Sequence, residues 1–181
     1  MRKLIGAINM TVDGFCDHTS GIADDEIHQH YSDLLRNSGV VLYGRVTYNL
    51  MEYWIDVLNN PTGNNATDEF AEAIDSIPKI VFSGTLENME WETAKLAKRD
   101  LKDVVSELKQ QPGKDILVGS RSLIIECLNL NLMDEFQLCI QPVIEGKGLP
   151  LFENIKQKIN LKLLKTKTFK CGAVLHYYKP L

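Results

Sequence analysis

Two glycine-containing turns carry the clearest chemical signal in this sequence. Residues 44–48 (GRVTY) follow the apolar run 40–43, and residues 119–123 (GSRSL) follow the apolar run 116–118. In each case a strand pattern ends in a glycine, which lets the backbone approach a ligand, and the next residues begin a helix. The free N–H groups and the positive dipole end of a helix favour an anion. Two such turns in one chain predict a long anionic cofactor.

The cysteine and histidine residues form neither a disulfide framework nor a metal site by their spacing. His28 and His30 are two positions apart, so a helix directs them to roughly opposite sides, whereas zinc-binding pairs on a helix are four apart. The cysteines have no C-x-x-C spacing and are expected to be buried free thiols. They are Cys16, Cys127, Cys139 and Cys171.

Length and charge define the broad class of protein. The chain has 181 residues, of which 44% are hydrophobic, a size that suits one domain over 1–181. The formal net charge of −4 argues against a general nucleic-acid binder. No segment has the apolar length of a membrane span, and the first residues, MRKL, do not resemble a signal peptide. We expect a cytoplasmic protein with no nucleic-acid or membrane partner.

Strand and helix patterns alternate over the first two thirds of the chain. Apolar runs at 3–10, 40–43, 79–82 and 116–118 predict strands. Helical periodicity predicts helices from 24 to 36, after Gly44 with the stripe Val46, Leu50 and Trp54, through 70–74, over 101–108 and over 123–128. The segment 59–65, rich in Asn, Pro and Gly, predicts a loop. The first two thirds therefore predict a parallel sheet.

The last third contains strand patterns alone. Apolar residues alternate with polar ones over 136–141, and the runs 161–169 and 173–178 meet around Gly172. These three segments predict antiparallel strands. Together with the earlier alternation, they predict an α/β fold with a mixed, mostly parallel sheet that ends in a C-terminal antiparallel hairpin.

Four motifs in this order resemble the dihydrofolate-reductase-like superfamily: residues 9–14 (NMTVDG), 44–48, 119–123 and 146–152 (GKGLPLF). The sequence is most similar to the branch that contains the reductase domain of the bacterial riboflavin-biosynthesis deaminase-reductase. The resemblance covers essentially the whole chain. It implies a three-layer fold with helices on both faces of the sheet, NADPH across the carboxyl ends of the parallel strands, and a homodimer.

The resemblance also implies which residues bind the cofactor. Gly44, Arg45 and Thr47 would hold one part of NADPH, and Ser83 another. The pyrophosphate would lie at a helix N-terminus formed by Gly119, Ser120, Arg121, Ser122 and Leu123.

Arg45 offers a physical reason for a phosphorylated nicotinamide cofactor. A guanidinium binds phosphate through two parallel hydrogen bonds. A cation at a helix start opposes the helix dipole unless an anion is present. The alternative is a solvated surface arginine.

Reduction of a C=N bond by hydride also needs a proton. The resemblance directs attention to the first helix, where Asp25, Glu26 and His28 are all candidates and the sequence does not choose among them. The alternative is that Asp24 and Asp25 cap the helix. Asp13, in a T-x-D-G turn, is either an active-site residue or a turn-forming aspartate.

Two further features have two interpretations each. The segment 146–152 either wraps a ligand or forms a tight turn in a β-hairpin that needs positive φ. Tyr48, Tyr53 and Trp54 have helical spacing and are interpreted as core or subunit-contact residues rather than a stacking platform. The dimer face is expected on the helix with Val46 and Leu50 or on the late strands.

The leading hypothesis is an NADPH-dependent oxidoreductase that transfers a hydride to a pterin-like or pyrimidine-like heterocycle, as in riboflavin biosynthesis. The zinc signature of a deaminase, H-x-E with P-C-x-x-C, is absent, which predicts a stand-alone reductase domain. The L-P-W segment of dihydrofolate reductases is also absent, which argues against folate reduction. The alternatives are a non-catalytic nucleotide-binding module and a structural dimer on the same fold.

Overall fold

A mixed sheet forms the centre of the protein. The computed structural model describes residues 1–22 and 24–181, and within them the sheet has eight strands in the order β4-β3-β2-β5-β1-β6-β8-β7. Every neighbouring pair is parallel except the two that involve β8. The strands are β1 (Leu4–Thr11), β2 (Ser38–Gly44), β3 (Lys79–Phe82), β4 (Ala94–Leu96), β5 (Asp115–Val118), β6 (Glu135–Gln141), β7 (Leu161–Thr168) and β8 (Val174–Pro180).

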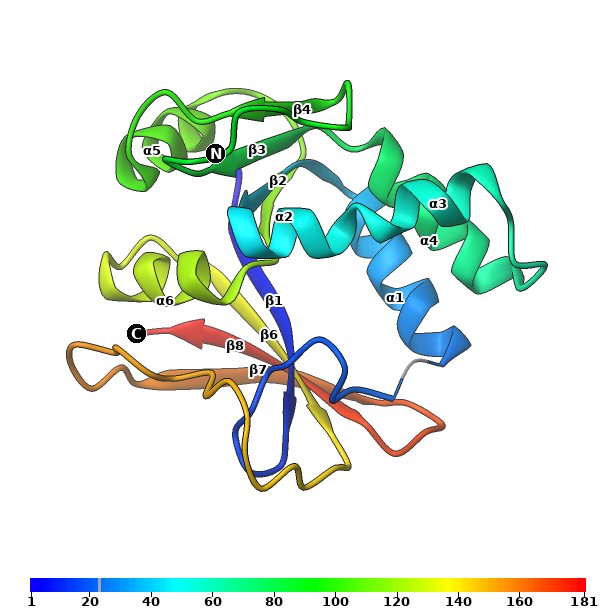
Figure 1. Ribbon diagram of the computed structural model, residues 1–181. Helices are drawn as coiled ribbons and strands as arrows, with labels where there is room; N and C mark the ends of the chain where they lie inside the picture. The colour runs from blue at the N-terminus through cyan, green and yellow to red at the C-terminus, as the bar shows by residue number, and fades with distance from the viewer. Residues whose placement is uncertain (23) are drawn as a thin grey trace.

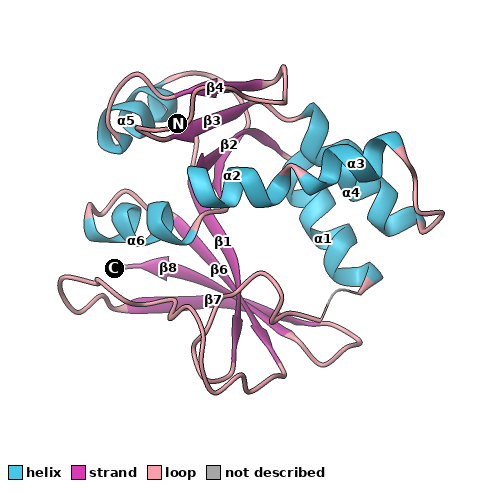
Figure 2. Ribbon diagram, in the orientation of Figure 1, coloured by secondary structure: helices cyan, strands magenta, loops and turns pink. Residues whose placement is uncertain are grey.

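Helices cover both faces of this sheet. Helices α5 and α6 lie on one side, and α1, α3 and α4 lie on the other (Figure 1; Figure 2). An apolar core fills each interface, with Val105 and Ile124 in one core and Leu35 and Ile74 in the other. The three-layer prediction is therefore confirmed. The helices are α1 (Asp25–Arg36), α2 (Arg45–Met51), α3 (Tyr53–Asn59), α4 (Asn65–Ser76), α5 (Leu101–Gln110) and α6 (Arg121–Asn129).

Two strands differ from the prediction. The alternation over 136–141 predicts an antiparallel strand, but β6 runs parallel to β1 and is antiparallel only to β8. Both faces of β6 are covered, so the polar side chains of Gln137 and Gln141 are buried as well as apolar side chains between them. The strand β4 has no counterpart in the prediction, because three residues are too few to show a period.

The stripe after Gly44 predicts one helix, whereas the chain forms two. Helices α2 and α3 meet at Glu52, whose φ of −56° and ψ of −25° keep the path close to helical. Two residues of the predicted stripe lie on the surface, because Val46 is 64% exposed and Leu50 is 36% exposed, and a dimer face there stays a prediction. Trp54 does pack inward, with its ring centroid 4.5 Å from that of Phe70.

The two tyrosines of this region have different environments. Tyr48 is fully buried, and its hydroxyl accepts a hydrogen bond from the N–H of Glu90 at 3.0 Å. Tyr53 is 61% exposed. Tyr48 is therefore confirmed as a core residue, whereas Tyr53 is not one and stays a predicted subunit-contact residue.

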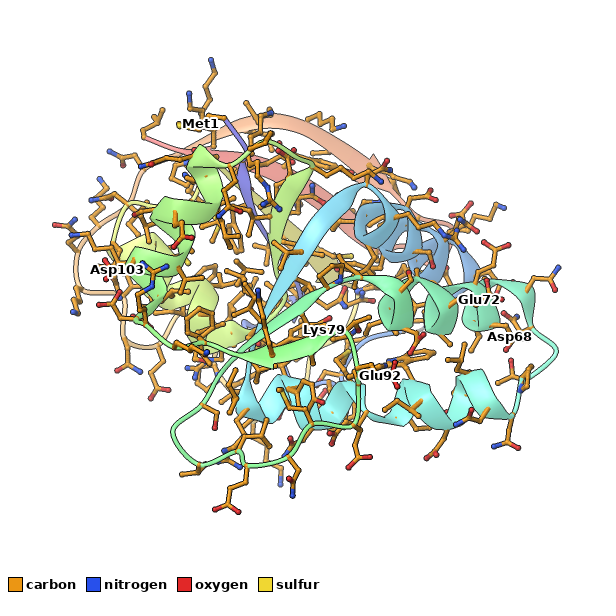
Figure 3. The ribbon with its side chains drawn as sticks, turned by 90° about the horizontal axis from the view of Figure 1, so that it is seen from above. Met1, Asp68, Glu72, Lys79, Glu92 and Asp103 are labelled. Atoms are coloured by element: carbon orange, nitrogen blue, oxygen red, sulfur yellow. The ribbon has the colours of Figure 1, made fainter. Side chains whose placement is uncertain are left out.

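A buried lysine fixes the end of α4 against the sheet. The ammonium of Lys79 donates to the carbonyls of Asp75 and Ile77 at 3.1 and 2.9 Å, and to the Thr93 hydroxyl at 2.9 Å. A cation is stabilised by the carbonyl end of a helix. Seen from above, Lys79 lies near the middle of the molecule, whereas Asp68 of α4 lies toward its rim (Figure 3).

The histidines of α1 lie apart from each other, and the cysteines form no disulfide among the described residues. His28 lies against aromatic rings of α3 and α4, and His30 lies against Phe169, so the two rings do lie on different sides of α1. Among residues 1–22 and 24–181, no cluster of three or more His, Cys, Asp or Glu side chains is placed to hold a metal ion, and no helix could cross a membrane. The four cysteines are free, and Cys127 and Cys139 are buried.

His30 should make the protein sensitive to acid. Burial, with Lys167 as a second cause, lowers the pKa of His30 to about 4. An unfolded histidine titrates near pH 6.5, so between these values the unfolded chain binds more protons and stability falls as the pH is lowered. We expect His30→Phe to recover roughly 2–3 kcal/mol of the stability that the wild type loses between pH 7 and pH 4.5, measured by urea unfolding.

The control is His18→Gln, at an exposed loop position. It should lose stability in acid as the wild type does. Equal acid losses in His30→Phe and the wild type would show that His30 is not the sensitive group.

Candidate active site at the carboxyl edge of the sheet

The two glycine turns lie side by side, because they follow adjacent parallel strands, β2 and β5. The N–H of Gly44 donates to the hydroxyl oxygen of Ser120 at 2.8 Å, and Ser120 is 1% exposed. A Cβ atom at Gly44 would lie 3.3 Å from the hydroxyl oxygen of Ser122, tighter than most real contacts. One hydrogen bond therefore joins the turn before α2 to the turn before α6.

The helices that follow these turns begin without a side-chain cap. Gly44 has no side chain, and the hydroxyl oxygen of Ser120 accepts from Gly44 instead of from α6. Helices α1, α4 and α5 differ, since Asp24, Asn64 and Asp100 each accept a hydrogen bond from the first turn of their helix. The capping interpretation of Asp24 is thus confirmed. First-turn N–H groups stay free of side-chain caps where the two turns meet, and an anion can bind there.

The other residues of the first turn lie around this edge. Arg45 is exposed, and within the described part of the chain its guanidinium makes no hydrogen bond or ion pair. Thr47 is half-buried. Ser83 comes directly after β3, the next strand beside β2, and its hydroxyl oxygen accepts from two backbone N–H groups of the following turn at 3.1 and 2.9 Å. The structure thus brings Gly44 and Ser83 to one edge of the sheet.

In the second turn, Gly119 allows a close approach of backbone to an aromatic ring. A Cβ atom there would lie 3.0 Å from the ring of Tyr43, which is itself buried. Leu123 is buried in the core beneath α6 and anchors the helix. This turn is therefore held by packing on one side and by the Ser120 hydroxyl on the other.

Arg121 holds a loop. Its Nε donates to the carbonyl of Pro150 at 2.6 Å, and its Nη2 donates to the carboxylate of Glu153 at 2.8 Å. Its side chain is 19% exposed, which is low for an arginine. The guanidinium that the sequence assigns to pyrophosphate is thus engaged with the segment that follows β6. A surface hollow of about 340 Å³ lies beside it, between α6 and residues 153–156.

Two loops pack together where β1 and β6 end, residues 12–22 and residues 142–160. Phe15 and Pro150 form an isolated antiparallel bridge, and the N–H of Cys16 donates to the carbonyl of Leu149 at 2.9 Å. The dark blue and yellow-orange loops lie side by side in Figure 1. The hairpin interpretation of 146–152 is wrong, because β6 pairs with β1 and β8 and not with β7. Positive φ is confirmed, at 78° for Gly146.

Asp13 is a clamp between these loops. Its carboxylate accepts from the Thr11 hydroxyl at 2.7 Å, from the N–H of Gly146 at 2.7 Å and from the N–H of Glu145 at 3.1 Å. These hydrogen bonds, that of Thr11 foremost, hold the pKa of Asp13 below its usual value. The carboxylate is therefore ionised at neutral pH and acts as an acceptor.

The three acid-base candidates of the first helix contact different elements. Glu26 accepts from the N–H of Lys170 at 2.8 Å, and that contact lowers its pKa. Asp25 accepts from the side chain of Asn64 at 2.9 Å, beside a polar hollow of about 530 Å³ between α1 and α4. His28 lies 3.4 Å from a threonine hydroxyl of α4, and burial lowers its pKa. The structure does not gather these side chains with Asp13 into one cluster.

Sequence reasoning missed a polar cluster on the α1 face of the sheet. Asn9 of β1 accepts hydrogen bonds from the Tyr31 hydroxyl and from the side-chain amide of Gln141, both at 3.1 Å. Gln141 is 1% exposed. The available signal was an asparagine inside an apolar strand, together with polar residues at inward positions of β6.

Comparison with known proteins identifies the family of this chain. The family model of the RibD C-terminal domain matches residues 2–175. The chain belongs to the RibD C-terminal domain family. Among curated proteins, the uncharacterized Bacillus subtilis (strain 168) protein YyaP is 36% identical over 181 residues, covering 98% of this chain and 94% of YyaP.

Two solved structures share the fold of this RibD C-terminal domain. RibD of Acinetobacter baumannii superposes with a TM-score of 0.71 at 16% identity, covering 100% of this chain and 58% of that chain. The diaminohydroxyphosphoribosylaminopyrimidine deaminase/5-amino-6-(5-phosphoribosylamino)uracil reductase of Thermotoga maritima gives a TM-score of 0.67 at 16% identity. That match covers 99% of this chain and 57% of the Thermotoga maritima chain. The chain thus spans little more than half the length of these two proteins.

Removing the Asp13 clamp should loosen the loop that it holds. In Asp13→Ala, the N–H groups of Glu145 and Gly146 lose their acceptor, so their hydrogen exchange should become faster than in the wild type. Exchange in β1 and β5 should not change. Amide exchange followed by NMR checks this, with Asp103→Ala, an exposed acid on α5, as the control. A wild-type exchange rate for Gly146 in Asp13→Ala would contradict the clamp.

Proposed function

We propose that this protein is an NADPH-dependent reductase that transfers a hydride to a pyrimidine-like heterocycle of the kind processed in riboflavin biosynthesis. The observation that carries the proposal is the pairing of two uncapped helix starts by the Gly44 to Ser120 hydrogen bond. Family membership supports it, and the Thermotoga maritima protein of the same fold is named as a reductase.

The donor set suits a dinucleotide. The first-turn N–H groups after Ser120 would hold the pyrophosphate, and the exposed guanidinium of Arg45 would bind the additional phosphate that distinguishes NADPH from NADH. Gly44 and Gly119 let the two turns pack closely against Ser122 and Tyr43, which keeps these donors together. The bound nicotinamide would supply the hydride from its C4 atom.

The strand pairing supports a position for the substrate. Strand β1 pairs with β5 only over Leu4–Gly6, and with β6 as far as Thr11. The second half of β1 therefore extends beyond its pairing with β5. In open α/β sheets, ligands bind where neighbouring connections diverge to opposite sides. We place the heterocycle against this half of β1.

The predicted acid-base residues receive different assignments within this proposal. Asp13 and Glu26 have lowered pKa values and accept backbone N–H groups, so we assign them to positioning rather than to proton donation. His28 stays a predicted proton donor. The protein would then contribute mainly orientation of the two ligands and exclusion of water by the loops 12–22 and 142–160.

We also propose a homodimer, because exposed apolar side chains lie on an edge strand. All residues of β7 are exposed, and its leucines at 161, 163 and 164 are 38%, 49% and 49% exposed. Their association would remove apolar surface from water. Light scattering of the purified protein distinguishes a dimer from a monomer.

Arg45→Ala should weaken NADPH binding more than NADH binding. Loss of a phosphate contact by a guanidinium costs about 1–3 kcal/mol, which corresponds to roughly 5- to 150-fold in Kd. Titration followed by nicotinamide fluorescence measures both constants. Arg99→Ala is the matched control, because Arg99 is an exposed arginine paired with Glu107 of α5.

The same titration decides the cofactor assignment. NADPH binding that is equal in Arg45→Ala and Arg99→Ala would remove Arg45 from the site. Failure of the wild type to bind either dinucleotide would overturn the reductase proposal. Oxidation of NADPH in the presence of 5-amino-6-(5-phosphoribosylamino)uracil, followed by nicotinamide absorbance, would establish the chemistry.

A further inference from the structure

A network of hydrogen bonds fixes the orientation of two side-chain amides beside β1. The backbone N–H of Ile22 donates to a side-chain oxygen of Gln141 at 3.2 Å. A backbone N–H can only donate, so this contact identifies the oxygen of the Gln141 amide. The nitrogen of that amide must then face Asn9, 3.1 Å away, and the group that it meets must be an acceptor.

The orientation of Asn9 follows from that of Gln141. Its side-chain oxygen, Oδ1, accepts from Gln141 and from the Tyr31 hydroxyl, so both acceptor positions are occupied. Its nitrogen, Nδ2, carries two N–H donors and has no acceptor among residues 1–22 and 24–181. Asn9 is only half-buried, and its Nδ2 does not belong to the fully buried polar atoms that lack a hydrogen-bond partner. The nitrogen therefore keeps contact with solvent.

Strand register puts Asn9 on the part of β1 that extends beyond its pairing with β5. Gly6 is the last residue of β1 that pairs with β5, and Asn9 lies three positions further along the strand. On its other side Asn9 pairs with Cys139 of β6. Its contact with Tyr31 puts the side chain on the face covered by α1. Asn9 thus lies where β1 has passed its last pairing with β5, and both N–H donors of its Nδ2 are oriented by its partners.

We propose that Asn9 determines substrate specificity, by donating from Nδ2 to a carbonyl oxygen or ring nitrogen of the heterocycle. Tyr31 and Gln141 are positioning residues, because they occupy Oδ1 and leave only the donor end for the ligand. This inference rests on the proposed function, since it assigns a contact with the ligand of the same site. An amide that is oriented by fixed partners discriminates among ligands, because a bound ligand without the matching acceptor shields the amide from water and leaves it unpaired.

Asn9→Asp tests this assignment with little change in shape. A carboxylate still accepts from Tyr31 and Gln141, so the contacts that join β1, β6 and α1 persist. The free end of the side chain, however, becomes an acceptor and opposes an acceptor on the ligand. A purely structural role would tolerate the change, whereas a ligand contact would be lost.

The experiment measures two affinities by calorimetry, for NADPH and for 5-amino-6-(5-phosphoribosylamino)uracil, with and without the other ligand. We expect Asn9→Asp to weaken the uracil compound at least about 10-fold and to leave NADPH binding and urea stability near wild type. Tyr31→Phe, which frees Asn9 to rotate, should weaken the uracil compound about threefold. Asn88→Asp adds the same charge at an exposed loop position and should change neither affinity.

Three results would overturn the role of Asn9. They are equal affinity of the wild type and Asn9→Asp for the uracil compound, no binding of that compound by the wild type, and a joint loss of both affinities with stability. Failure of the proposed function looks different. A wild type that binds the uracil compound without oxidising NADPH is not this reductase, and the two affinities for the uracil compound still decide the role of Asn9.

Discussion

The hydrogen bond from Gly44 to Ser120 is the constraint on which the candidate site depends. It is formed by residues 76 positions apart and is possible only because β2 and β5 are adjacent and parallel. It also uses the hydroxyl that would otherwise cap α6. The same contact therefore sets the spacing of the two turns and leaves the start of α6 without a side-chain cap. A side chain at Gly44 would press against Ser122, so the sequence of one turn constrains the other.

The loops that follow β1 and β6 depend on the same edge. Arg121, in the first turn of α6, ties down Pro150 and Glu153, and Asp13 ties down Glu145 and Gly146. Arg121 contacts a backbone carbonyl and a carboxylate of the loop 142–160, and Asp13 contacts two of its backbone N–H groups. These contacts hold the loop beside the end of β1. The polar cluster around Asn9 lies on the α1 face near this end, where β1 extends past β5.

Local patterns predicted most of this fold. The order of strands and helices, the glycine turns and the cap at Asp24 all follow from short stretches of sequence, where propensity and periodicity act. The family resemblance supplied the three layers. Strand β4 was missed because of its length. For β6 the antiparallel pairing with β8 was predicted and the parallel pairing with β1 was missed, because alternation reflects which faces are covered, not which neighbours a strand has.

The site itself was only partly predictable. The glycine turns lie in one place, as two phosphate-binding turns require, but the engagement of Arg121 depends on a glutamate 32 positions away. The orientation of Asn9 depends on Gln141, 132 positions away. Such contacts are fixed by tertiary packing, and a single sequence carries no local signal for them.

The most direct test of the account is a backbone amide NMR titration with NADPH. The two turns act as one site only if their N–H groups respond together. We expect the amide resonances of residues 44–48 and 119–123 to shift with a common affinity. The amide resonances of residues that line the hollow between α1 and α4 should not shift. Shifts confined to one turn, or centred on the hollow between α1 and α4, would contradict the paired-turn site.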